Sequence, residues 1–128
     1  MPDIYVISDT HFSHANLWNE FPMRRREWSN SVEEMDEYMI ARWNETVQDD
    51  DVVIHLGDFV FGNTDRIRYI RSRLRGSMWL VLGNHDRTAT SMRTCLSRHD
   101  YVCKRLEFTY GYGEGSTHVI CRHRPQDF

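Results

Sequence analysis

Three short apolar segments, each followed by polar residues, divide the first two thirds of the chain. They cover residues 3–8, 52–56 and 78–82 and are rich in Val, Ile, Leu and aromatic side chains. The second and third are apolar almost throughout, which is typical of strands buried on both faces of a parallel sheet, and His55 is expected to pack within its strand. The pattern therefore predicts three parallel strands.

Apolar residues between these strands recur at helical spacing. Residues 31–47 begin with the capping box Ser31-Val-Glu-Glu34, in which Ser31 accepts a hydrogen bond from the backbone near Glu34. One face of this segment is lined by Val32, Met35, Met39, Trp43 and Thr46. A second stripe, in residues 64–75, ends at Gly76. The spacing predicts helices over these two segments and shorter helices over 14–20 and 90–98.

The pattern changes near residue 101. Residues 101–109 and 117–122 are both of strand type, and the glycine-rich segment 111–115 joins them, so we expect an antiparallel hairpin. Parallel strands alternating with helices, followed by a hairpin, predict the α/β class. A chain of 128 residues has the length of one domain, which we place at residues 1–128.

Composition and charge restrict the function classes. Apolar residues make up 40% of the chain and charged residues 27%, values of a globular protein, and no apolar run approaches the roughly 18 residues of a membrane span. No secretory leader is recognisable, so we expect a cytoplasmic protein with no membrane partner. The net charge of −3 argues against general binding to duplex nucleic acid. Cys95, Cys103 and Cys121 lack metal-type spacing and are expected to be free thiols.

Basic residues are almost all arginine: of the 16, only Lys104 is a lysine. Five arginines lie in the predicted helix over 64–75, at positions Arg66, Arg68, Arg71, Arg73 and Arg75. We interpret them as a solvated helix face, and an RNA-binding stripe is the alternative.

Polar residues follow each predicted parallel strand. Asp9-Thr-His11 follows the first, Gly57-Asp58 the second and Gly83-Asn-His-Asp86 the third. The carboxyl ends of parallel strands share one edge of a sheet, where ligands bind, so these side chains are expected to meet. A lone Asp after a strand is normally a turn or cap residue, but three such motifs in order indicate a site.

The residue types at this edge favour a metal site. Carboxylates, imidazoles and an amide suit Mn²⁺, Fe or Zn²⁺ better than a soft metal ion. Asp9 and His11 are two positions apart, so an extended segment places both side chains on one side, where they can bind one ion. Asp58 has two oxygens and can bridge two ions. His123 ends the later strand over 117–122 and is a further candidate.

These motifs, with His123 in the segment Cys121-Arg-His-Arg-Pro125, resemble the calcineurin-like metallophosphoesterase superfamily, in particular its small bacterial and phage-encoded members. The resemblance covers about residues 3–125. It implies an αββα sandwich around two divalent metal ions, with Mn²⁺ expected and Fe, Zn²⁺ or Ni²⁺ as alternatives. It also implies hydrolysis of a phosphate-ester substrate, with phosphodiesters expected, by a hydroxide that bridges the metals.

The resemblance assigns the metal ligands position by position. Asp9 and His11 would bind the first metal, and Asp58 would bridge both metals. Asn84 and His123 would bind the second metal.

The same resemblance implies the catalytic and substrate-binding residues. His85 would be the general acid, oriented by Asp86, and Asn84 would touch the substrate phosphate. His14 lies in the loop near the metals and is a candidate substrate contact, or else a helix cap or surface residue. Arg122 stands where the family has a small residue.

The family pattern ends in a Gly-His-x-His motif that completes both metal spheres, and only five residues follow His123 here. The domain is therefore expected to be C-terminally short for this family, with an unpaired sheet edge through which two copies could dimerise. Three explanations are open: a longer protein, a short form completed by water, another side chain or a partner subunit, and a decayed form. The last predicts an alternative function, a catalytically weak or inactive metal-binding or protein-interaction module on the same fold.

Overall fold

A four-stranded parallel sheet forms the centre of the computed structural model, which describes residues 2–15 and 31–124. The strands are β1 (Ile4–Ile7), β2 (Val52–His55), β3 (Ser77–Val81) and β4 (Tyr101–Cys103), in the order β1-β2-β3-β4. All three neighbouring pairs are parallel. The three parallel strands expected from the apolar segments are thus confirmed, and β4 is an additional one.

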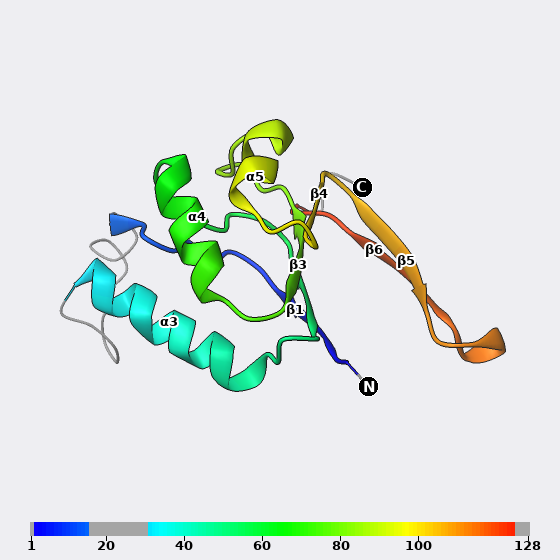
Figure 1. Cartoon of the computed structure of the whole chain (residues 1–128). Helices are drawn as coiled ribbons and strands as arrows, with labels where there is room; N and C mark the ends of the chain where they lie inside the picture. Colours follow the sequence, from blue (N-terminus) through cyan, green and yellow to red (C-terminus); the bar gives the residue numbers. More distant parts are fainter. Residues whose placement is uncertain (1, 16–30, 125–128) are drawn as a thin grey trace.

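Three helices lie on one side of this sheet (Figure 1). They are α3 (Val32–Thr46), α4 (Thr64–Arg73) and α5 (Ala89–Cys95). Each begins at a side chain that satisfies a free backbone donor: Ser31 accepts from the Glu34 N–H of α3, Asn63 from the Arg66 N–H of α4 and Thr88 from the Ser91 N–H of α5. The expected helix over 14–20 falls almost entirely outside the described residues.

The segment 101–109, expected to be one strand of a hairpin, is divided between two sheets. Tyr101–Cys103 pairs with β3, whereas β5 (Leu106–Tyr110) pairs antiparallel with β6 (Thr117–Cys121). The chain changes sheets at the exposed residues Lys104 and Arg105. Neither Gly nor Pro marks this break, so the strand-type residues on both sides of it look continuous in sequence. The α/β class is confirmed.

The core has two parts because side chains alternate between the faces of the central sheet. Val53, Met78 and Leu80 face the helices and join a cluster with residues of α3, α4 and α5. Their neighbours Ile54 and Val81 face the other way and pack against the β5–β6 hairpin. The hairpin therefore covers the face of the sheet that the helices leave free (Figure 1).

The cover on that face is incomplete at β1, an edge strand of the central sheet. Val6 is 61% exposed and Ile4 is 41% exposed. Dimerisation through an open sheet edge stays a prediction. Among the described residues, no helix combines the length and the apolar character that crossing a bilayer requires. Cys95, Cys103 and Cys121 are free thiols, as expected.

Candidate metal centre

The loops after β1 and β2 run side by side beyond the ends of their strands. The backbone N–H of Asp9 donates to the Gly57 carbonyl at 2.9 Å, and that of His11 donates to the Asp58 carbonyl at 3.0 Å. The two loops are therefore fixed in register. This pairing brings the first two sequence motifs together at the carboxyl edge of the sheet, as the strand pattern predicts.

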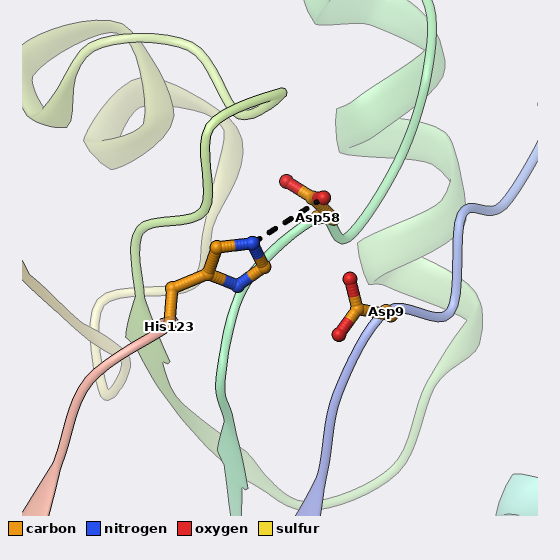
Figure 2. Close-up of side chains that lie close together, drawn as sticks. All are labelled: Asp9, Asp58 and His123. Carbon is orange, nitrogen blue, oxygen red and sulfur yellow. Dashed lines mark ion pairs between the residues drawn. The ribbon is translucent and has the colours of Figure 1, made fainter. Parts of the chain in front are cut away.

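Asp9, Asp58 and His123 point toward one another at this edge, although they come from three distant parts of the chain (Figure 2). One ligand atom of each residue lies within 4.8 Å of the others. His11 Nε2 is 3.5 Å from Asp9 Oδ1 and 3.6 Å from Asp58 Oδ2. His123 Nε2 is 3.5 Å from the same Asp58 Oδ2. This oxygen therefore lies within 3.6 Å of two imidazole nitrogens.

Asp58 is oriented by its own hydrogen bonds. The residue is buried, and its Oδ1 accepts from the His85 N–H at 2.8 Å, so Oδ2 faces the two imidazoles. The adjoining glycines leave the necessary space. A Cβ on Gly83 would clash with the Asp58 carboxylate, and a Cβ on Gly57 would lie 2.6 Å from His123 Nδ1. The glycines of the second and third motifs are thus required by close packing of the site.

His123 and Asn84 form the other side of the centre. His123 Nδ1 donates to the Leu56 carbonyl at 2.6 Å, so in the neutral ring Nε2 carries the lone pair. Asn84 Oδ1, also an acceptor, lies 2.9 Å from that nitrogen. Two facing acceptors are favourable only with a proton or a cation at the site, because acceptor lone pairs repel each other. The pair has the arrangement of two ligands of one ion.

The backbone at several of the predicted ligands is strained. Asp9, His11, Ser13 and Asp58 have φ values of 54°, 49°, 64° and 56°, in the left-handed region. A residue with a side chain is held there at a cost of roughly 1–3 kcal/mol. Such residues cluster at functional sites, where the surrounding structure fixes them.

Asp86 acts on the loops of the site. Its carboxylate accepts from the backbone N–H groups of Asp58 at 2.8 Å, Phe59 at 2.9 Å and Gly83 at 2.7 Å. The sequence predicts that Asp86 orients His85. These bonds contact the backbone and not the His85 side chain, and they join the loop after β2 to the loop that carries His85.

His55 fixes the same loops from behind. Its ring is fully buried, Nδ1 accepts from the Gly57 N–H at 3.1 Å, and Nε2 lies 2.9 Å from Thr10 Oγ1. The Thr10 hydroxyl in turn donates to the Phe59 carbonyl at 2.9 Å. Burial lowers the pKa of His55 to about 3, so the ring stays neutral. The expectation that His55 packs within its strand is confirmed, and its hydrogen bonds also hold the site.

A buried network that the sequence pattern does not predict lies beneath the first loop. Asp36 of α3 is 1% exposed and accepts from the Ser13 N–H at 2.7 Å and the Ser13 hydroxyl at 2.6 Å. Arg66 of α4 donates to Asp36 Oδ2 and to Ser13 Oγ, both at 2.7 Å. The network holds Ser13 in its left-handed conformation, two residues from His11. The available signal was a carboxylate four residues from both Val32 and Ile40 on the apolar face of the helix.

Phe61 was also missed, although it forms a wall of the site. Its ring centroid is 3.8 Å from that of His14, 5.4 Å from that of His85 and 6.1 Å from that of His11. His14 and His85 are thereby placed beside His11, a predicted ligand. The structure brings all the predicted ligands together and puts His14 at their border; the roles of these residues stay predictions.

Electrostatics at Asp9 favour its ionised form. Burial alone would raise the pKa of this carboxyl, but the Ser8 hydroxyl bond and the nearby His123 and His11 outweigh it and lower the pKa below its ordinary value. Buried thiols behave in the opposite way, since burial raises the pKa of Cys103 and Cys121.

Comparisons with known proteins agree with this geometry. A sequence model of the calcineurin-like phosphoesterases matches residues 2–125. An uncharacterized protein of Methanocaldococcus jannaschii is 39% identical over 95 residues, which cover 73% of this chain and 52% of that protein. The Gene 66 protein of Mycobacterium phage D29 is 32% identical over 138 aligned positions, which cover 98% of this chain and 65% of the phage protein.

One solved structure is also similar. A protein of unknown function from Aquifex aeolicus matches with a TM-score of 0.70 at 26% identity, over 95% of this chain and 60% of that one. The chain thus spans between 52% and 65% of the length of these three proteins.

Proposed function

Because the chain belongs to the calcineurin-like phosphoesterase family, we propose that it hydrolyses phosphate esters, with phosphodiesters as its preferred substrates, using two divalent metal ions. The observation that carries the proposal is the position of Asp58 Oδ2, 3.6 Å from His11 Nε2 and 3.5 Å from His123 Nε2. A carboxylate oxygen shared by two imidazoles is the arrangement that a bridging ligand needs.

The donor set fits two ions of the expected kind. Asp9, His11 and Asp58 would hold one ion, and Asp58, Asn84 and His123 would hold the other. All are oxygen or imidazole nitrogen donors, which suit Mn²⁺, with Fe, Zn²⁺ and Ni²⁺ as alternatives. The lone pair of His123 Nε2 and the free oxygen of Asp58 already face the shared space. When bound, the ions would supply a lowered pKa for a shared water and would neutralise charge on the phosphate.

The remaining steps use side chains around the centre. Asn84 would orient the substrate phosphate through its amide. His85 is exposed and packs against Phe61, where it would give a proton to the leaving oxygen. His14, whose ring centroid is 3.8 Å from that of Phe61, would contact the substrate. Asp86 would keep the loop of His85 in place through its three backbone hydrogen bonds.

The first experiment measures metal content and turnover together. The protein is loaded with Mn²⁺, and hydrolysis of bis-p-nitrophenyl phosphate and of p-nitrophenyl phosphate is followed. Asp58→Asn should lower both metal content and the diester rate, the rate by at least about 100-fold, because even partners of ligands contribute 10–100-fold. Asp65→Asn, at an exposed carboxylate of α4, is the matched control and should leave both unchanged.

A second variant separates catalysis from metal binding. His85→Ala should keep the metal content and lower kcat by roughly 100-fold or more on a diester with a poor leaving group. The loss should be smaller for nitrophenyl esters, whose leaving group needs little protonation. Bound metal without turnover above the Asp58→Asn background would contradict the enzyme and favour a metal-binding or interaction module.

A further inference from the structure

A groove of about 430 Å³ adjoins the metal centre on the side of Asn84 and His123, and both residues line it. Four basic residues also line the groove: Arg87, Lys104, Arg122 and Arg124. They come from separate parts of the chain, since Arg87 follows the third motif, Lys104 joins β4 to β5, and Arg122 and Arg124 follow β6. The fold therefore gathers these charges at a place that already touches two proposed metal ligands.

Three of the four basic residues of the groove lack a carboxylate partner among the described residues. Within the described ranges, Arg87, Lys104 and Arg122 form no ion pair with a carboxylate, and Arg122 Nε is buried without an acceptor. Asp86 is the single carboxylate among the described lining residues, and its oxygens are engaged by three backbone N–H groups. Arg87 donates to the Gly62 carbonyl at 2.9 Å. In a chain with a net charge of −3, this concentration calls for an anionic ligand.

We infer that the groove binds a second phosphate group of the substrate, next to the phosphate at the metal centre. Guanidinium groups match phosphate oxygens in paired hydrogen bonds, and an ammonium adds a point charge. The preferred substrate would then be a phosphodiester with a neighbouring phosphate, either a 5′-phosphorylated oligonucleotide or a diphosphate ester. The claim that a phosphodiester bond is hydrolysed rests on the proposed function. The affinity of the groove for a second phosphate is independent of that function.

The kinetic test uses substrates that differ by one phosphate. Thymidine dinucleotide is compared with its 5′-phosphorylated form, and a dinucleoside diphosphate is compared with the matching monophosphate diester. We expect kcat/KM to be at least tenfold higher for the member of each pair with the extra phosphate. Arg122→Gln and Lys104→Gln should each remove most of this preference and leave kcat/KM for the single-phosphate substrates within about twofold.

A charge-matched control and a binding measurement make the outcomes distinct. Arg98→Gln removes an exposed arginine that precedes β4, at the other end of the sheet, and should keep the preference. Dissociation constants for the two dinucleotides, measured by calorimetry on the wild type and Arg122→Gln, do not depend on turnover. Preferential binding that Arg122→Gln abolishes, without hydrolysis of any substrate, would support the groove and overturn the proposed function. Equal affinity and equal kcat/KM for both members of each pair, unchanged in the variants, would overturn the groove.

Discussion

The arginines of α4 and the basic residues of the groove are chemically alike but have different surroundings. The four arginines of α4, and Arg75 just after it, each have a carboxylate partner at 2.7–3.0 Å; in chain order the partners of Arg66, Arg68, Arg71, Arg73 and Arg75 are Asp36, Asp65, Asp100, Glu37 and Asp49. In the groove, Arg87, Lys104 and Arg122 have no such partner among the described residues.

The difference separates charges that stabilise the fold from charges that are available to a ligand. Arg71 is 6% exposed, binds both oxygens of Asp100 and donates to the carbonyls of Leu74 and Gly76. Its charge is neutralised within the protein. The sequence allowed two interpretations of these arginines, a solvated helix face and an RNA-binding stripe. Because each arginine is paired with a carboxylate, the structure argues against an RNA-binding stripe. Arg71 is also buried, so a solvated face does not describe it either.

Breaking the buried pair should have the largest effect. Arg71→Met leaves the Asp100 carboxylate buried without its cation and should lower the free energy of unfolding by about 3–5 kcal/mol. Urea denaturation measures this loss. Lys104→Gln, at an exposed residue of the groove, should change it by no more than about 0.5 kcal/mol. Equal losses in the two variants would remove the distinction between the two groups of basic residues.

Lowering the pH should reduce the free energy of unfolding by a smaller amount. Burial would raise the pKa of Asp100, but bonds from Arg71 and from the backbone N–H groups of Met78 and Ser97 outweigh it and lower the pKa. A lowered pKa in the folded state stabilises the fold above the unfolded value, near 3.9, and this stabilisation is lost as the pH falls through the lowered pKa.

This dependence is measured as the free energy of unfolding between pH 5 and roughly pH 2.5. The wild type should lose stability over this window more steeply than Asp100→Asn, which has no carboxyl to titrate at that position. Identical slopes would show that Asp100 does not carry the acid sensitivity assigned to the pair.

The smallest effect should come from an exposed pair of the same helix. Arg68 and Asp65 are 51% and 87% exposed, so water and salt screen their attraction. Arg68→Gln should change the free energy of unfolding by less than about 0.5 kcal/mol. A double-mutant cycle with Asp65→Asn isolates the pairing energy. A coupling energy above 1 kcal/mol would mean that exposure of an arginine does not determine how much its ion pair stabilises the fold.

The sequence was sufficient to predict which side chains gather at the carboxyl edge of the sheet, because these residues follow local rules. Asp9, Asp58 and Asn84 lie just after strands, and parallel strands place such positions at one edge. The same local reasoning could not divide Tyr101–Thr109, since a change of sheet between Cys103 and Leu106 depends on tertiary packing and leaves no turn residue in the sequence.

The partners of buried charges were harder to predict. The spacing of Asp36 from Val32 and Ile40 indicates the apolar face of its helix, but the approach of Ser13 and Arg66, which makes its burial favourable, depends on the fold. The partners of the α4 arginines are between 3 and 36 positions away, so no single spacing identifies them.

The left-handed residues of the first two loops set stability against activity. Glycine adopts such a backbone without strain, so Gly at Asp9 or His11 would relieve the fold while removing a proposed ligand. Under the proposed function, selection for heat resistance alone would therefore enrich variants that fold better and have lost proposed metal ligands. Any effort to make it more robust should hold these positions constant and look for gains on the helix side of the sheet.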